Sequence, residues 1–277
     1  MKYALDVAPL GELADPRTLV RLAEAAEAAG WDGFSTWDSL GLAFGTVAAD
    51  PFLALAGAAM ATERIRLLAS VIVLPRRRPQ HVAQAAATLD GLSGGRLVLG
   101  VGAGGDRPDF EAFGEDWTSS VRVAQMDEAV RIVDALLRGE TVTSDGPAYP
   151  MRDVSIGPRP AQRPRPPIWL GARRPGGIRR AGAWDGWIAV SVGDDGVSLA
   201  ITPSALGEQV EIAREARRAA GLDGRAFDVA VFGNAGLGGF SPADFEAEGA
   251  TWWLESVTPE RVPLAEAMRA VEAGPPR

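Results

Sequence analysis

The sequence has no cysteine, and among its 277 residues it has only one histidine and one lysine. The absence of cysteine excludes disulfides, thiolate metal sites, iron–sulfur clusters and cysteine nucleophiles. A single histidine, His81, excludes a metal site built from several histidines. Lys2, as the only lysine, argues against a Schiff-base aldolase. No run of eighteen apolar residues is present, so the sequence predicts no membrane span.

Charge and composition narrow the class of protein further. The net charge of -8 argues against a general nucleic-acid binder. The first residues lack the long apolar core of a signal peptide, so we expect a cytoplasmic protein. Apolar residues make up 47% of the chain, which is enough for a large core. No linker or low-complexity tract divides it, and we expect one domain over residues 1–277.

Eight short apolar runs recur along the chain, and most are apolar throughout instead of alternating. Continuous apolarity is typical of strands that are buried on both faces of a parallel sheet. The runs cover residues 3–8, 33–37, 65–74, 96–102, 167–172, 186–190, 227–233 and 250–255.

Helical segments separate these runs. Five of these helices are expected to begin at a proline that follows a capping residue, whose side chain can accept hydrogen bonds from the free N–H groups of the first turn. The five pairs are Asp15-Pro16, Asp50-Pro51, Thr202-Pro203, Ser241-Pro242 and Thr258-Pro259. The expected helices cover residues 16–29, 50–61, 79–91, 119–138, 175–183, 203–220, 241–248 and 259–272. Eight alternating units predict an α/β protein with a (β/α)8 TIM barrel.

Two excursions interrupt this repeat. Residues 103–118 follow the fourth strand, and residues 139–166 precede the fifth. The second excursion contains ETVTSDGPAYPM, in which Asp145-Gly146 predicts a hairpin turn.

Residues 94–106, GGRLVLGVGAGGD, contain the pattern G-x-G-x-x-G at Gly100, Gly102 and Gly105. In dinucleotide-binding folds this pattern lies in the first βα turn and opens a helix directly. Here it follows the fourth strand, and no helix start comes immediately after it. We interpret it as a loop at the carboxyl end of a barrel strand, where this fold builds active sites. A turn that only needs positive φ is the alternative.

The sequence resembles the luciferase-like monooxygenases, the bacterial-luciferase-like flavin-dependent oxidoreductases. The resemblance is carried by ERIRLLASVIVLPRRRPQHVAQAAATLDGLSGGRLVLGVGAGGDRPDFEAFGE, MDEAVRIVDALLRGE, GPRPAQRPRPPIWLGARRPGGIRRAGAWDGW and EGATWWLE. It implies FMN or the deazaflavin coenzyme F-420 at the C-terminal mouth of the barrel, and oxidation or reduction of a small organic substrate. It also implies a homodimer. With FMN a separate flavin reductase would be a partner; with F-420 the reaction would be hydride transfer.

The resemblance also implies cofactor-binding positions. A non-proline cis peptide behind the isoalloxazine ring matches Ser70-Val71, and the ring would lie against the loop after the fourth strand. The phosphate would lie near the loop after the fifth strand, where two arginines and glycines favour an anion over a solvated basic loop. The implied residues are Ser70, Val71, Gly102, Ala103, Gly104, Gly105, Gly171, Ala172, Arg173, Arg174, Gly176 and Gly177.

The catalytic candidates follow the second and fourth strands. Many relatives have Trp-Asp-His after the second strand, whereas this chain has Trp37-Asp38-Ser39. Serine alone cannot replace histidine as a proton shuttle. Either Asp38 takes over the proton transfer, or hydride transfer needs no base there, or the protein binds flavin without turnover. The candidates are Trp37, Asp38, Ser39 and Asp106; a non-catalytic flavin-binding protein is the alternative function.

Several other residues have simpler interpretations. We expect Arg76, Arg77 and Arg78 to form a solvated charge run, and His81 to make a contact at a helix start. Trp252 and Trp253 should point in opposite directions from one strand, one of them into the barrel. The substrate pocket would be shaped by residues 39–49, 103–118, 191–202 and 234–240.

Overall fold

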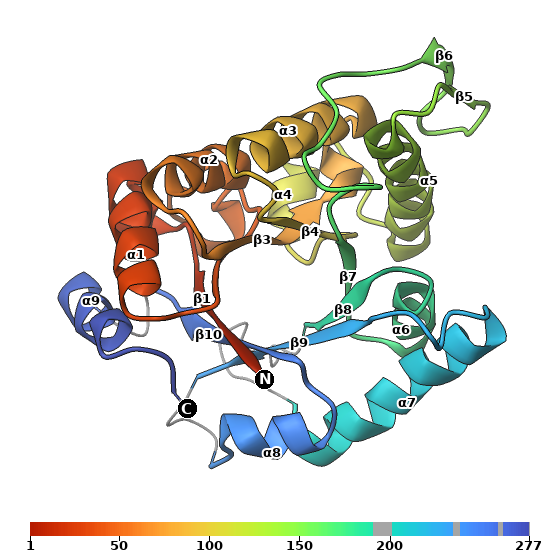
Figure 1. The fold of residues 1–277 in the computed structure, drawn as a ribbon. Helices are drawn as coiled ribbons and strands as arrows, with labels where there is room; N and C mark the ends of the chain where they lie inside the picture. Colours follow the sequence, from red (N-terminus) through yellow and green to blue (C-terminus); the bar gives the residue numbers. More distant parts are fainter. Residues whose placement is uncertain (191–200, 235–238, 260–262, 277) are drawn as a thin grey trace.

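Eight parallel strands close into a barrel in the computed structural model, which describes residues 1–190, 201–234, 239–259 and 263–276 (Figure 1). The order around the barrel is β1-β10-β9-β8-β7-β4-β3-β2, and every pair is parallel. The predicted TIM barrel is therefore confirmed. Its strands are β1 (Lys2–Val7), β2 (Gly33–Thr36), β3 (Arg66–Val73), β4 (Leu97–Gly102), β7 (Ile168–Ala172), β8 (Gly186–Ala189), β9 (Asp228–Gly233) and β10 (Trp252–Val257).

Helices surround the barrel close to their expected positions. They are α1 (Pro16–Ala28), α2 (Pro51–Ala61), α3 (Pro79–Leu92), α5 (Ser119–Arg138), α6 (Pro175–Ala181), α7 (Pro203–Ala219), α8 (Pro242–Ala247) and α9 (Leu264–Glu272). The side chains of Asp15, Asp50, Thr202 and Ser241 accept N–H groups of the first turn, as expected.

The expected helix start at Thr258-Pro259 is wrong. Strand β10 continues to Val257, so Thr258 directly follows a strand, and its buried hydroxyl has no hydrogen-bond partner among the described residues. Helix α9 begins only at Leu264, after Pro263.

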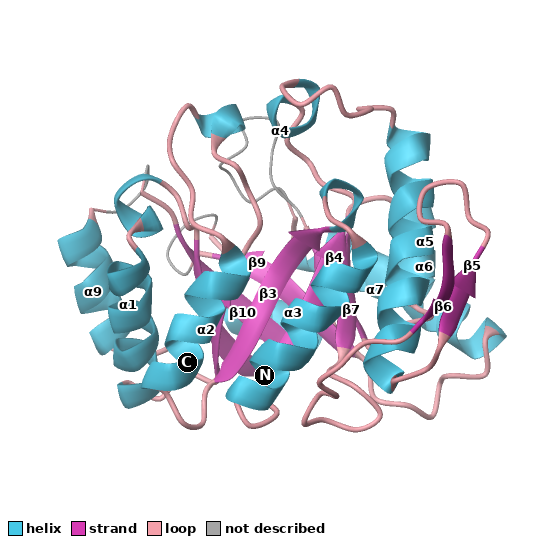
Figure 2. Cartoon of the chain, turned by 90° about the horizontal axis from the view of Figure 1, so that it is seen from above, coloured by secondary structure: helices cyan, strands magenta, loops and turns pink. Residues whose placement is uncertain are grey.

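Both excursions carry structure of their own. The first contains a short helix, α4 (Pro108–Glu111), which the sequence analysis did not expect. In the second, β5 (Val142–Ser144) and β6 (Met151–Val154) pair antiparallel, which confirms the hairpin. Figure 2 shows the carboxyl end of the barrel at the top with α4 above it, and the hairpin beside α5. No helix among the described residues is both long and apolar enough to span a bilayer.

The barrel interior is filled by side chains at its lower level. Trp169 and Trp252 meet edge to face there, with ring centroids 5.8 Å apart. Trp253 packs in the layer between strands and helices instead, so the expected opposite orientation is confirmed. A filled lower level leaves the carboxyl end of the strands as the place for a site.

Candidate active site at the carboxyl end of the barrel

The structure brings the catalytic candidates together because they follow neighbouring strands. Trp37, Asp38 and Ser39 come directly after β2, and Asp106 follows β4. Strand β3 lies between these two in the barrel. Residues 191–200 and 235–238, which the sequence analysis assigned to the substrate pocket, lie outside the described residues.

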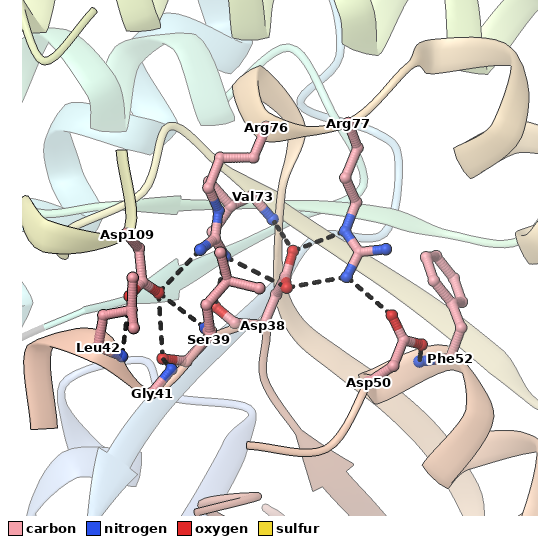
Figure 3. Close-up of polar contacts among 11 residues, drawn as sticks. Asp38, Ser39, Gly41, Leu42, Asp50, Phe52, Val73, Arg76, Arg77 and Asp109 are labelled. Atoms are coloured by element: carbon pink, nitrogen blue, oxygen red, sulfur yellow. Dashed lines mark hydrogen bonds and ion pairs between the residues drawn. The ribbon is translucent and has the colours of Figure 1, made fainter. Parts of the chain in front are cut away.

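Two residues, Arg77 and Val73, donate hydrogen bonds to the carboxylate of Asp38, and both carboxylate oxygens accept (Figure 3). Its side chain is 2% exposed. Arg77 donates from Nε to Oδ2 at 2.8 Å and from Nη2 to Oδ1 at 2.9 Å, and the N–H of Val73 donates to Oδ2 at 3.0 Å. Arg77 also reaches Asp50 at 3.0 Å. Asp38 is thus the anchor that joins the loop after β2 to the end of β3.

Burial lowers the pKa of the Arg77 guanidinium, but its hydrogen bonds to Asp38 and Asp50 outweigh burial and raise the pKa above its ordinary value. Arg77 is therefore a permanent positive charge beside Asp38.

Arg76 makes a second ion pair, with a residue that the sequence analysis did not single out. Its Nη1 donates to Oδ2 of Asp109 at 2.8 Å, and its Nη2 lies 3.2 Å from Oδ1 of Asp38. Asp109, in α4, is fully buried and also accepts the N–H groups of Leu40 at 2.7 Å and Leu42 at 3.2 Å. These bonds tie α4 to the loop after β2 (Figure 3).

The expected solvated charge run is therefore wrong for Arg76 and Arg77, although Arg78 is exposed. Two buried carboxylates that converge from different loops, Asp38 after β2 and Asp109 after β4, explain the difference. Spacing along the chain gives no sign of this convergence, because Asp38 and Asp109 are 71 residues apart. The only available signal was a pair of arginines that directly follow an apolar strand.

Ser39, at the position where the resemblance implies a histidine, is buried and bonded within the protein. Its Oγ donates to Asp109 at 3.3 Å and accepts the N–H of Gly41 at 3.0 Å. In this structure the hydroxyl stabilises the loop after β2.

Asp106 is the candidate whose chemistry fits proton transfer best. Burial raises the pKa of its carboxyl, and the negative charges of Asp109 and Asp38 raise it further, while Arg76 acts in the opposite direction. No hydrogen bond to its carboxylate is among those found for the described residues. A carboxyl with a raised pKa at the mouth can hold a proton, which is what general acid–base chemistry there requires.

A second acidic group, Asp6, lies inside the barrel and was missed by the sequence analysis. It comes from β1, two residues after the inward-facing Ala4. Ser35 of β2 donates to its Oδ1 at 2.6 Å and Ser70 of β3 donates at 3.0 Å, and the two hydroxyls also contact each other. Burial raises the pKa of Asp6 to about 6, although both hydroxyl bonds act to lower it. A single acid within an apolar run carries no sequence signal.

The peptide bond between Ser70 and Val71 is cis, as the resemblance implied. The pairing of β3 with β4 shifts its register at this point, between Ala69 and Ile72. A Cβ on Gly102 or Gly171 would lie 2.8 or 2.9 Å from the side chain of Val71. These two glycines therefore make room for the irregular part of β3.

The remaining glycines of the loop after β4 have different surroundings. A Cβ on Gly104 would meet Val73 and Phe110 within 3 Å, and its φ is +82°, so glycine is required there. A Cβ on Gly105 would meet nothing within 4 Å. Arg122 of α5, another residue that the sequence analysis missed, fixes this loop by donating to the carbonyls of Ala103 at 2.8 Å and Gly104 at 2.6 Å.

The candidate phosphate-binding residues lie at the end of β7 and the start of α6. Arg173, Arg174 and Gly176 are exposed, and a Cβ on Gly176 would meet nothing within 4 Å. Ala172 is bonded through its carbonyl to the indole N–H of Trp187 at 3.0 Å. Gly177 packs against Ala172. The loop therefore places the positive charges of Arg173 and Arg174, and the open space beside Gly176, next to the end of β7, which the bond from Trp187 to Ala172 fixes.

A cavity of about 390 Å³ lies at the other end of the barrel, beside the start of β9. It contains none of the candidate residues. Arg217 in its wall is already bonded to the carbonyls of Gly182, Trp184, Leu222 and Arg225, at 2.8 to 3.2 Å.

Comparison with known proteins decides the family. The family model described as luciferase-like monooxygenase matches residues 3–253. The chain belongs to this luciferase-like family. The fold agrees: a monooxygenase from Streptomyces bottropensis superposes with a TM-score of 0.81 at 22% identity, covering 99% of this chain and 97% of the other.

Two curated relatives of this luciferase-like chain match part of its length. A phthiodiolone/phenolphthiodiolone dimycocerosates ketoreductase of Mycobacterium tuberculosis is 34% identical over 163 residues, which is 58% of this chain and 40% of the relative. An F-420-dependent glucose-6-phosphate dehydrogenase of Beutenbergia cavernae is 38% identical over 183 residues, which is 64% of this chain and 53% of the relative. The matches thus span about half the length of these relatives.

The Arg76–Asp109 pair gives a stability prediction. Asp109→Asn should lower the free energy of unfolding by roughly 3 to 5 kcal/mol, because it leaves a buried guanidinium short of one carboxylate. Arg107→Gln is the matched control, since it breaks the exposed Arg107–Glu111 pair of the same helix and should cost under about 1 kcal/mol. The measurement is urea unfolding of each variant. Equal losses in the two variants would contradict the structural role of Asp109.

Asp6 gives a pH prediction. The folded-state pKa of about 6 lies above the ordinary value of 3.8, so the stability gained by the protonated carboxyl is lost as pH rises from 3.8 through 6. Between pH 4 and 7 the wild type should lose roughly 2 kcal/mol of unfolding free energy relative to Asp6→Asn. Asp145→Asn, in the exposed turn of the hairpin, is the control. A difference between wild type and Asp6→Asn that stays constant with pH would refute the assignment.

Proposed function

We propose that this protein is a flavin-type oxidoreductase that binds FMN or coenzyme F-420 at the C-terminal mouth of its barrel and oxidises or reduces a small organic substrate. The observation that carries the proposal is the glycine loop after β4. Arg122 fixes this loop, Gly102 makes room for Val71 at the register shift of β3, and the loop leads to Asp106. When bound, the cofactor would supply the hydride or oxygen chemistry.

The residues at the mouth fit such a group. Val71 and the loop Gly102–Asp106 would contact the flat ring, because Gly105 leaves open space beside a backbone that is held in place. Arg173 and Arg174, with Gly176 and Gly177, would bind the phosphate, since guanidinium groups and small residues suit an anion. Gly171 and Ala172 would support that loop from the end of β7.

Each catalytic candidate has a distinct role in this proposal. Asp106 would hold or accept the substrate proton, because burial and neighbouring negative charge raise the pKa of its carboxyl. Asp38 and Ser39 would act as positioning residues for the loop after β2. Trp37, half-buried beside them, would form a wall of the pocket.

The choice of cofactor separates two versions of the reaction. With F-420 the protein would transfer hydride, as the name of the dehydrogenase relative indicates for that enzyme. With FMN it would be a monooxygenase that requires a separate flavin reductase. The dehydrogenase relative's name supports the F-420 version and the neighbouring monooxygenase structure supports the FMN version, and Asp106 can serve either.

One observation favours a second candidate function, a flavin-binding protein without turnover. Ser39 stands where the resemblance implies a histidine, and its hydroxyl is bonded within the protein instead of facing a substrate. Tight cofactor binding with no oxidation or reduction of any substrate would support this alternative.

A fluorescence titration with FMN, and separately with F-420, tests the proposed function. We expect saturable binding of one cofactor at micromolar concentration. Arg174→Glu should weaken binding at least tenfold by placing a negative charge beside the phosphate, whereas Arg218→Glu, an equal charge change on α7, should have no effect. If neither cofactor binds, the proposed function is wrong.

We also propose that the protein forms a homodimer through α2. All eleven residues of this helix, PFLALAGAAMA, are apolar or glycine. Leu53 and Met60 are 76% and 71% exposed, and seven residues of spacing place them on one face. A helix that is apolar on all sides is normally buried, so a second copy is the expected cover for this face.

Leu53→Asp should convert the dimer to a monomer, because a carboxylate would be buried in the interface. Light scattering should give a molar mass of twice 29.0 kDa for the wild type and 29.0 kDa for the variant. Leu92→Asp changes an exposed leucine on α3 and should remain a dimer. A wild-type mass of one chain would refute the interface.

A further inference from the structure

Four large apolar side chains stand exposed on the loop after β2. Leu40, Leu42 and Phe44 are 45%, 44% and 39% exposed, and we call these three the apolar lip; Val47, further along the loop, is 67% exposed. The chain from residue 39 to residue 49, SLGLAFGTVAA, contains no charged side chain. Phe113, two residues beyond α4, is 63% exposed on the excursion that Asp109 ties to the lip. Apolar side chains that gather on one edge are typical of a binding surface.

The lip is held in one conformation by contacts on both sides. Asp109 accepts the N–H groups of Leu40 and Leu42. Gly41 has a φ of +80°, and a Cβ there would lie 2.2 Å from the carbonyl oxygen of Thr46, so the turn is tightly closed.

The other side of the loop is tied to the segment after β1. The N–H of Gly11 donates to the carbonyl of Val47 at 3.0 Å, and the N–H of Ala49 donates to the carbonyl of Pro9 at 2.9 Å. Because these hydrogen bonds hold the loop, its apolar side chains stay at the surface. Less conformational entropy is then lost when an apolar ligand binds.

The position of the lip connects it to the candidate active site. The ring of Phe44 contacts that of Trp37, with centroids 5.8 Å apart. Trp37 directly precedes Asp38, and Asp109 links the lip to the loop that carries Asp106. The lip therefore borders the mouth, and α2 with its exposed Leu53 follows further along the chain.

We propose that the apolar lip binds the hydrocarbon part of the substrate, so that the substrate carries an extended apolar chain or ring system. This inference rests on the proposed oxidoreductase function. The lip offers no charge to a phosphate or sugar acid, and apolar contact is the interaction it can make. The reacting carbon would lie beyond the lip, towards Asp106.

The test is the affinity for a series of 2-ketones with 4 to 11 carbons, measured by calorimetry on the cofactor-loaded protein. The dissociation constant should fall about fourfold for each added methylene, the factor that corresponds to about 0.8 kcal/mol of burial per methylene. Leu42→Asn should reduce this dependence on chain length and leave cofactor affinity unchanged. Leu92→Asn, which changes an equally exposed leucine on α3, is the matched control and should keep the wild-type dependence.

The outcomes separate this inference from the proposed function. Cofactor binding together with ketone affinity that does not depend on chain length would overturn the lip's role and leave the proposed function standing. Failure to bind either cofactor would overturn the proposed function first. If Leu42→Asn changes the molar mass in light scattering instead of the chain-length dependence, the lip is a contact between copies and the inference is wrong.

Discussion

The buried guanidinium of Arg76 is the constraint on which the candidate site depends. It lies between Asp38, at the end of β2, and Asp109, in the excursion after β4, and Arg77 completes the set through Asp38 and Asp50. Neither carboxylate could be buried alone at acceptable cost. The loops after β2 and β4 are therefore fixed to each other across the end of β3, and the mouth is shaped before any ligand arrives.

The candidate site consists of packed residues that hold its loops in place and of more open residues that are available to a ligand. Gly102 and Gly171 make room for Val71, Gly104 for Val73 and Phe110, and Arg122 holds the adjoining carbonyls. What remains open above this support is Gly105, the raised-pKa carboxyl of Asp106 and the exposed Arg174. Support built from packed side chains and chemistry placed on loops is how a barrel scaffold carries a particular function.

Sequence patterns were sufficient for the fold because most strands are apolar throughout and four helices begin at a proline that the preceding side chain caps. They failed at Thr258-Pro259, where the strand's pairing to β1 outweighed the local capping pattern. They also failed at Arg76, Asp109 and Asp6, whose partners are 29 to 70 residues away and meet only in the closed barrel. The glycines of the loop after β4 were located correctly, but Gly102 and Gly104 are required by protein side chains, a reason that the sequence does not contain.

Binding of a flavin-type cofactor at the mouth of this luciferase-like barrel is best measured by a crystal structure with bound FMN or F-420. We expect the ring between Val71 and the loop that ends at Asp106, with the phosphate at Arg173 and Arg174. A cofactor found in the arginine-lined cavity beside the start of β9 would rule this site out, because none of the residues assigned to it lines that cavity.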